Sequence, residues 1–413
     1  MKKELIPAYI SGTLVNIPLF MVIVFLPPYM RKLGASNFQI GVLSTIYFLV
    51  SMPASLFWGS LSDLLENRKL LPLGSIISFS IILLVLSWSS TPAQVIILRA
   101  FIGLTLPAFT APLLALISEH STTERRGGDI SWYNAFLSLG RMIGLLVTGY
   151  LALFFSFSSL FRGFVIVLLG TLLPILFLPR SLFSVHIPQL DTIIDEMKSR
   201  VFPEKEGRSV LWENGLIFLY LSITLRVICI VGFASFLPLY LTEELGYNLQ
   251  FLGNFSAIGS GIMVFSMLVA GYSADVLGRK CIVLTGLLLS FLTPIFYILG
   301  ENFLLFLWLG RIFHSFGYSF LMSGSSAFVG DIARKKEQGA LMGWIRLSFS
   351  FGGVIGPMIM GTILGPVGYT KTAFIMSFFA LCGLILTFFK VEETIEVKDR
   401  GRFSFMKVFS ETE

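Results

Sequence analysis

The chain has 413 residues, of which 55% are hydrophobic and only 13% are charged. Soluble domains carry about 25% charged residues, so this composition excludes a water-soluble fold. The formal net charge is +6. The basic residues follow the expected membrane topology, so the charge gives no indication of nucleic-acid binding.

Twelve apolar runs follow one another along the chain. A helix needs about 20 apolar residues to cross a bilayer, and its backbone groups must be paired internally. The runs are continuous rather than alternating, which predicts helices. The first run leads into eleven more, so we interpret it as a helix and not as a signal peptide. The predicted helices cover 5–29, 38–61, 70–88, 93–118, 130–154, 161–179, 212–240, 249–272, 281–299, 303–328, 340–363 and 371–390.

The Lys and Arg residues predict the orientation. If the N-terminus is cytoplasmic, the outside segments hold only Arg31, Lys32, Arg162 and Lys371, and most other basic residues fall inside. An excess of Lys and Arg on the cytoplasmic side is the positive-inside rule. We therefore expect a multi-pass protein of the cell (plasma) membrane with both termini in the cytoplasm.

The sequence contains a parallel repeat at an offset of 212 residues. In the first helix the offset is 211, where "FLPPY" (25–29) matches "FLPLY" (236–240). Parallel halves usually place a substrate site between them near the bilayer midplane. The repeat predicts a six-helix bundle in 1–180, a cytoplasmic linker in 181–210, a second six-helix bundle in 211–392 and a cytoplasmic tail in 393–413. The repeated pairs include Gly41 and Gly253, Arg99 and Arg311, Gly140 and Gly352, Gly144 and Gly356, and Gly149 and Gly361.

One loop motif occurs in both halves, as "GSLSDLLENRK" (59–69) and "GYSADVLGRK" (271–280). The pattern resembles the major facilitator superfamily, whose loop between helices 2 and 3 reads G-x-x-x-D-[RK]-x-G-[RK]-[RK]. The second copy matches with Gly271, Asp275, Gly278, Arg279 and Lys280, and departs only at Val276, where a basic residue is usual. The first copy keeps Gly59 and Asp63 and has Arg68 and Lys69 displaced by one position.

The resemblance implies an all-α integral membrane protein with two pseudo-symmetric bundles of six helices. It also implies that each loop motif is a gate latch, in which the Asp accepts hydrogen bonds from a neighbouring helix N-terminus or from the basic residues after it. The alternative is a tight two-helix turn whose charges serve topology only. We expect a larger gating role for Asp275 than for Asp63.

Two further motifs carry the resemblance. Arg99 and Arg311 occupy a position in helices 4 and 10 where the family often has an arginine, although such a residue can also extend to the membrane surface. Drug exporters of the family tend to have G-x-x-x-G-P-x-x-G-G in helix 5. Helix 5 here reads "GRMIGLLVTG" (140–149), and the better copy, "GGVIGPMIMG" (352–361), lies in helix 11. Small residues at this spacing also serve close helix packing.

Five arginines fall within the predicted spans, whereas every Asp and Glu falls outside the spans or at their edges. A buried arginine normally needs an anion, which we expect to be the substrate. The alternative is that these arginines reach main-chain carbonyls or the membrane surface, and that His314 is a packed neutral histidine. The arginines are Arg99, Arg141, Arg226, Arg311 and Arg346. The predicted substrate-binding residues are Arg141, Arg226, Asn134, Asn16, His314 and Tyr318.

These observations predict a secondary active transporter that moves a small organic anion by alternating access. The alternative is a proton-coupled exporter of drugs and other hydrophobic compounds. We expect no enzyme, because the sequence lacks a nucleophile–base pair and a metal cluster. It also lacks a phosphate-binding loop, so we do not expect ATP to drive transport. The three cysteines have no paired spacing, so neither a disulfide nor a metal site is expected.

The expected partners are the substrate, the lipid bilayer and a coupling proton or exchanged anion. We expect a monomer, no cofactor and no nucleic acid.

Overall fold

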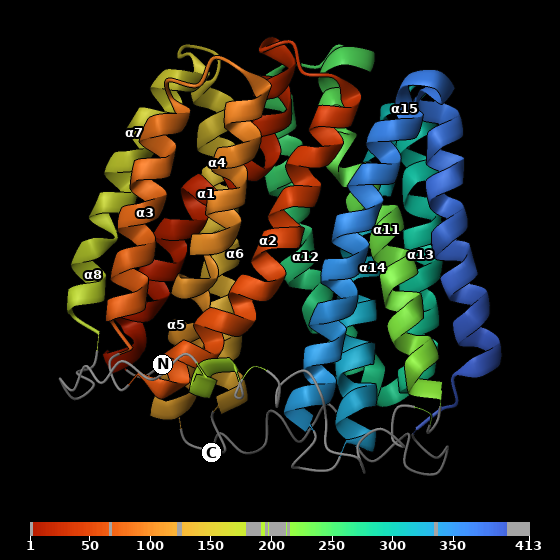
Figure 1. Cartoon of the computed structure of the whole chain (residues 1–413). Helices are drawn as coiled ribbons and strands as arrows, with labels where there is room; N and C mark the ends of the chain where they lie inside the picture. The colour runs from red at the N-terminus through yellow and green to blue at the C-terminus, as the bar shows by residue number, and fades with distance from the viewer. Residues whose placement is uncertain are drawn as a thin grey trace, which may run out of the picture. The chain divides into compact units, whose positions relative to one another are not determined.

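The computed structural model describes residues 3–65, 68–121, 126–178, 191–194, 197, 212, 215–333 and 338–394, and within these ranges it contains helices and no strands (Figure 1). A short 3-10 helix, η1 (Lys3–Leu5), precedes the first long helix. The helices of the first half are α1 (Ile6–Lys32), α2 (Asn37–Leu64), α3 (Leu70–Leu86), α4 (Pro92–Thr105), α5 (Pro107–His120), α6 (Arg126–Leu151), α7 (Phe157–Gly170) and α8 (Leu172–Leu176). Those of the second half are α11 (Leu216–Leu239), η3 (Tyr240–Glu244), α12 (Leu249–Leu277), α13 (Arg279–Leu299), α14 (Leu304–Ile332) and α15 (Gln338–Lys390).

The helices in the described residues agree with the twelve predicted spans. Ten helical segments are long and apolar enough to cross a membrane, with α4–α5, α7–α8 and α11–η3 each counting as one. The apolar helix α3 is shorter, at 17 residues. Gly368 has a φ of 78° inside α15, so this element consists of two helices joined at that glycine. The all-α membrane fold is therefore confirmed, and the side on which the termini lie stays a prediction.

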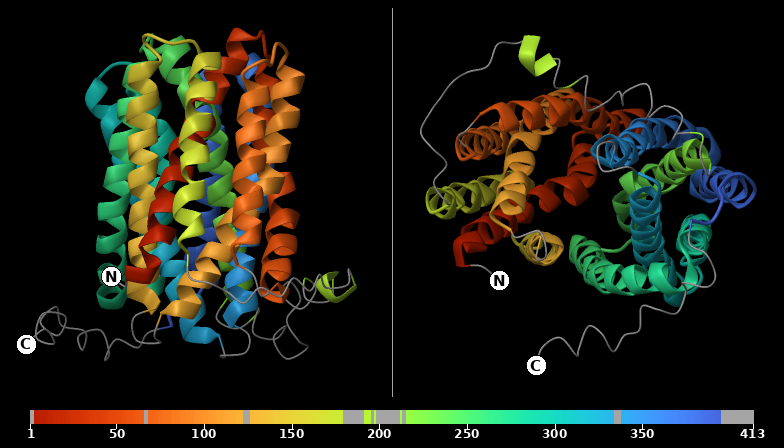
Figure 2. Two further views of the ribbon diagram at one scale, coloured as in Figure 1. Left: turned by 90° about the vertical axis from the view of Figure 1, so that its left-hand side faces the viewer. Right: turned by 90° about the horizontal axis from the view of Figure 1, so that it is seen from below.

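The chain divides into two compact units. The first unit comprises residues 1–198, 234–261 and 353–366, and the second comprises 199–233, 262–352 and 367–413. Figure 2 gives two further views of the ribbon. The predicted boundary at residue 180 and most of the predicted linker 181–210 lie outside the described residues, although 191–194 are helical. Nearly all of the predicted tail 393–413 also lies outside them, so the domain boundaries stay a prediction.

The repeat seen in the sequence recurs as matching hydrogen bonds. In the first unit, the Tyr9 hydroxyl of α1 donates to the main-chain oxygen of Asp129 in α6 at 3.5 Å. At the equivalent place in the second unit, the Tyr220 hydroxyl of α11 donates to the main-chain oxygen of Leu341 in α15 at 2.9 Å. Each bond joins the first helix of a half to the fifth.

Glycines bring the same pairs of helices close together. A side chain on Gly140 of α6 would overlap main-chain atoms of Thr13 in α1. Its equivalent, Gly352 of α15, lies in the same way against Thr224 of α11, where a Cβ would be 2.7 Å from the main-chain oxygen. Close backbone approach at small residues is a common way for membrane helices to associate.

The first unit also contains parts of α12 and α15, which pack on α6 and α2. A Cβ on Gly149 of α6 would be 2.9 Å from Cα of Gly253 in α12, and a Cβ on Gly361 of α15 would be 3.0 Å from Cα of Gly41 in α2. These two crossings are equivalent under the repeat. In the same unit, Nε of Arg31 at the end of α1 forms an ion pair with Oε1 of Glu243 at 3.0 Å.

A π-helical turn explains why the repeat changes its offset from 211 to 212. In the first half the amide of Leu33 donates to the Tyr29 oxygen, four residues earlier, at 3.2 Å. In the second half the amide of Leu245 donates to the Tyr240 oxygen, five residues earlier, at 3.0 Å. Tyr240 matches Tyr29 at an offset of 211, and Leu245 matches Leu33 at 212. The π turn η3 therefore accommodates one extra residue without ending the helix.

Candidate substrate-binding site

Arg226, near the middle of α11, is buried more completely than the other charged side chains that the structure describes in the second unit, with 1% of its surface exposed. Its Nε donates to the Ser290 hydroxyl of α13 at 3.0 Å. The guanidinium carbon lies 5.6 Å from the ring centre of Tyr318 in α14. The terminal nitrogen Nη2 is buried and has no hydrogen-bond partner among the described residues. One side of the guanidinium is thus fixed, and the other still offers a donor.

Two glycines bring α13 and α14 close together around Ser290. A Cβ on Gly317 of α14 would be 2.8 Å from the Ser290 hydroxyl oxygen, and one on Gly286 of α13 would be 2.7 Å from the amide nitrogen of Leu321. The Ser290 hydroxyl donates to the Gly286 oxygen at 2.7 Å, so it can accept from Arg226. This packing places Tyr318 over the guanidinium.

His314 lies one turn before Tyr318 on α14, within electrostatic reach of Arg226 and Arg311. Arg226, Tyr318 and His314, which the sequence placed in one site, therefore lie in one region of the second unit. Because both neighbouring charges are positive, His314 in this region is surrounded by groups that attract an anion.

Arg141, the corresponding candidate in the first unit, lies on α6 and contacts α1. Its guanidinium carbon is 4.3 Å from the ring centre of Phe20. Asn16, one turn before Phe20 on α1, is buried and donates its amide nitrogen to the Gly12 oxygen of its own helix at 2.8 Å. Asn134 is exposed on α6. The first unit therefore brings Arg141 and Asn16 to the same pair of helices, whereas Asn134 lies almost two turns before Arg141.

The arginines of the fourth helix in each half have different partners. Arg99 of α4 is buried, and its guanidinium carbon lies 4.3 Å from the ring centre of Tyr47 in α2. Arg311 of α14 instead lies beside Tyr297 of α13. The position equivalent to Tyr47 is Gly259, so the second half has no ring there to stack on. The arginine is therefore present in both halves, but the aromatic residue that it contacts lies on a different helix in each half.

The first copy of the loop motif forms an ionic network within the first unit. The Nη1 atom of Arg68 is 2.9 Å from the Asp63 carboxylate at the end of α2, and its Nη2 atom is 2.5 Å from the Glu119 carboxylate near the end of α5. Gly59, four residues before Asp63, is buried in α2. The displaced arginine thus connects two helices.

The second copy forms a related network within the second unit. The Nε atom of Arg279 is 3.1 Å from the Asp331 carboxylate at the end of α14. Gly278 has a φ of 98°, a left-handed conformation that favours glycine, and makes the turn between α12 and α13. Gly271 lies in α12 one turn before Asp275. The Asp275 side chain lies outside the described part of the structure, so its gating role stays a prediction.

Sequence reasoning missed the acidic partners of both networks. Glu119 and Asp331 lie 212 residues apart, so the same repeat that revealed the loop motifs could have identified them. It also missed Glu393, which follows α15. Its Oε1 accepts the Arg279 amide at 2.9 Å, and its two carboxylate oxygens accept the Lys280 amide at 3.3–3.4 Å. Glu393 thereby satisfies free amides at the start of α13.

Comparison with known proteins identifies the family. The sequence model of the Major Facilitator Superfamily matches residues 8–299 and 264–412. The chain belongs to the major facilitator superfamily. It is 28% identical over 301 residues to the multidrug resistance protein MdtG of Klebsiella pneumoniae (strain 342), covering 70% of each chain.

Solved structures share the fold at low sequence identity. A bacterial homologue of the human lysosomal transporter Spinster, in an inward-facing and unoccupied conformation, has a TM-score of 0.72 at 15% identity, over 94% of this chain and 97% of the other. The human organic anion transporter MFSD10 has a TM-score of 0.68 at 16% identity, over 94% and 100%. Family and fold indicate membrane transport of small molecules rather than catalysis.

Proposed function

We propose that this protein is a secondary active transporter that moves a small organic anion by alternating access. The observation that supports this most strongly is the terminal nitrogen Nη2 of Arg226, which is buried and unpartnered among the described residues. A buried guanidinium without an anion is costly, and a carboxylate or phosphate can accept two parallel hydrogen bonds from it.

The surroundings of Arg226 favour an anion from the solvent over a protein carboxylate. Among the described residues, the Asp and Glu side chains lie at or near helix ends or in loops, and four of them pair with Arg31, Arg68 and Arg279. Tyr318 and His314 add polar groups beside the guanidinium, and we propose that they orient the substrate. Arg141 and Asn16 are proposed as ligands contributed by the first unit, and Asn134 as a weaker one.

The test is binding and uptake with matched arginine variants. Purified protein is screened by thermal shift against metabolite carboxylates and phosphates, and the strongest ligand is labelled for uptake into proteoliposomes. Arg226→Ala should abolish binding, and Arg226→Lys, which keeps the charge but loses the planar fork, should weaken it by a moderate factor. Arg141→Ala should also reduce binding. Arg346→Ala is the control. The sequence placed this arginine within a span with the other four, but the structure leaves it exposed on α15.

Two results would contradict the proposal. One is that no anion raises the unfolding temperature of the wild-type protein. The other is that Arg226→Ala and Arg141→Ala both bind every tested anion as well as Arg346→Ala does. Either result would contradict a role for Arg226 and Arg141 in binding an anionic substrate.

The second candidate is a proton-coupled exporter of apolar compounds. It is favoured by the names of relatives such as MdtG, described as multidrug resistance proteins, at 28% identity. Efflux of a fluorescent cationic drug from cells that produce the wild-type protein, with a dependence on the proton gradient, would support it. If Arg226→Ala leaves that efflux unchanged while no anion binds, this candidate replaces the first.

A further inference from the structure

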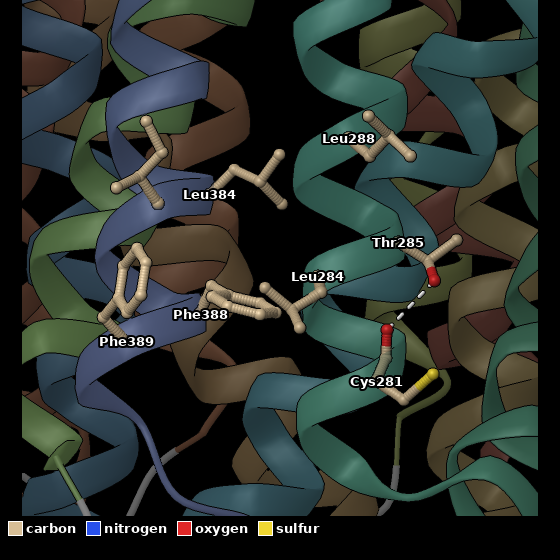
Figure 3. Close-up of a pocket in the computed structure, with 8 residues that line it drawn as sticks. Cys281, Leu284, Thr285, Leu288, Leu384, Phe388 and Phe389 are labelled. Carbon is tan, nitrogen blue, oxygen red and sulfur yellow. Dashed lines mark hydrogen bonds between the residues drawn. The ribbon is translucent and has the colours of Figure 1, made fainter.

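A groove on the second unit lies between α13 and the last part of α15, apart from the residues proposed for transport (Figure 3). It has a volume of about 350 Å³ and is open on one side. In Figure 3, Leu384 and Phe388 of α15 extend toward α13, and Leu284 extends back toward them. The groove is lined by Cys281, Leu284, Thr285, Leu288, Leu384, Ile385, Phe388 and Phe389.

The lining of the groove suits a hydrocarbon chain. Its one hydroxyl, on Thr285, already donates to the Cys281 main-chain oxygen at 2.9 Å. The remaining lining is apolar except for the Cys281 thiol, which is a weak donor. A polar ligand would therefore find few partners here. Both helices are predicted to cross the bilayer, so an exposed groove of this composition faces acyl chains.

Positive charge lies at one end of the groove. Lys280 directly precedes Cys281 at the start of α13, and its ammonium donates to the Phe388 oxygen at 2.9 Å. Lys390 directly follows the lining residue Phe389 at the end of α15. Its ammonium lies 6.0 Å from the ring centre of Phe218 in α11, so it adds positive charge near the groove rather than inside it. Among the described residues, neither lysine forms an ion pair with a carboxylate.

Two acidic groups near the lysines are already engaged, and the exposed Glu392 forms no ion pair with either lysine among the described residues. Glu393 accepts the amides of Arg279 and Lys280, and Asp331 pairs with the Arg279 side chain. The ammonium groups of Lys280 and Lys390 therefore keep their charge available at the membrane surface. Basic residues at this depth attract anionic lipid headgroups.

We infer that this groove is a binding site for an anionic phospholipid, with one acyl chain between α13 and α15, the phosphate held by Lys280, and Lys390 adding attraction for the negative headgroup. The apolar lining selects a chain, and the two lysines select a negative headgroup over a zwitterionic one. This lipid site faces the bilayer, and the inference does not depend on which substrate the protein transports.

Cys281 provides a reporter inside the groove, because its side chain is exposed whereas Cys229 is buried. The purified protein in detergent is treated with N-ethylmaleimide, and peptide mass spectrometry follows alkylation of Cys281 separately from Cys382. Added phosphatidylglycerol should slow alkylation of Cys281 at least fivefold, whereas phosphatidylcholine and glycerol 1-phosphate should leave it within twofold.

Variants separate the headgroup from the chain. Lys280→Gln with Lys390→Gln should remove the protection by phosphatidylglycerol, whereas Lys371→Gln should retain it. Leu288→Trp should fill the groove and reduce retention of phosphatidylglycerol in native mass spectrometry, and Leu268→Trp, at an exposed leucine of α12, should not. Equal protection by both lipids, no protection by either, or full protection in the double lysine variant would overturn the inference.

Discussion

At the scale of single residues, the bond between Arg226 and Ser290 determines what the guanidinium can offer. The serine hydroxyl accepts from Nε, which directs the rest of the group toward Tyr318. A serine in this position costs little as a helix residue, because its own hydrogen is satisfied by the Gly286 oxygen. A single hydroxyl on α13 thus both anchors the arginine of α11 and leaves Nη2 available.

Ser290→Ala should destabilise the protein and weaken anion binding. The variant leaves a buried N–H of Arg226 without an acceptor, and an unsatisfied buried donor costs about 1–3 kcal/mol. Ser260→Ala is the control, because this buried hydroxyl bonds to the Ser256 oxygen of its own helix. Thermal unfolding in detergent measures both variants. Equal unfolding temperatures for the two would show that the Arg226 contact does not contribute to stability.

The sequence predicted Arg226 as a site residue but could not predict its serine partner. An isolated arginine in an apolar run is conspicuous, since its charge must be satisfied. Ser290 is one of several hydroxyls within the spans, and spacing along a helix does not reveal which neighbouring helix it contacts. That contact depends on Gly286 and Gly317, whose importance appears only when α13 and α14 are packed.

At the scale of helices, the sequence predicted most of the membrane spans. It did not predict the places where a span is broken or changes its hydrogen bonding. The bilayer imposes a minimum apolar length, which made the twelve runs visible. The span predicted at 93–118 is divided at Leu106 between α4 and α5, where Pro107 begins the second helix. The π turn after Pro238 was visible only as a one-residue slip in the repeat, because its cause is a change in backbone hydrogen bonding.

Gly149→Val should loosen the crossing of α6 with α12. Its Cβ would be 2.9 Å from the Gly253 Cα and 3.1 Å from the Leu249 oxygen, so the backbones must separate. Overpacking of this kind typically costs about 1–3 kcal/mol. Gly163→Val on α7 makes the same chemical change where no atom lies within 4 Å of the added Cβ. After heating, size-exclusion chromatography should show that Gly149→Val loses its folded peak at a lower temperature than Gly163→Val. Identical profiles would contradict a contribution of the α6–α12 crossing to stability.

At the scale of the whole molecule, transport requires two states, and the loop motifs are proposed to stabilise one of them. Each half has an arginine that pairs with an acidic residue on its fourth transmembrane segment, Glu119 or Asp331. Each network lies within one unit, so the two halves carry equivalent charged contacts at the ends of equivalent helices. Interactions made in only one state set the balance between states.

Asp275→Asn should slow transport while membrane insertion stays normal, because one bond of the closed gate loses its charge. Asp63→Asn should have a smaller effect, since Arg68 keeps its ion pair with Glu119. Initial uptake rates in proteoliposomes, normalised to the amount of inserted protein, compare the two. An unchanged rate for Asp275→Asn would exclude the gate latch at that position.

The ion pair of Arg31 with Glu243 has a consequence for the history of the chain. Glu243 lies 212 residues after Arg31, in the register that the repeat has beyond the π turn η3, and the two residues meet each other. In a symmetric dimer of identical halves, a residue that meets its own equivalent meets a copy of itself. Two arginines or two glutamates at this place would repel, so the bond cannot have existed in an ancestor with identical halves. It became possible only once the two halves had diverged in sequence at this place.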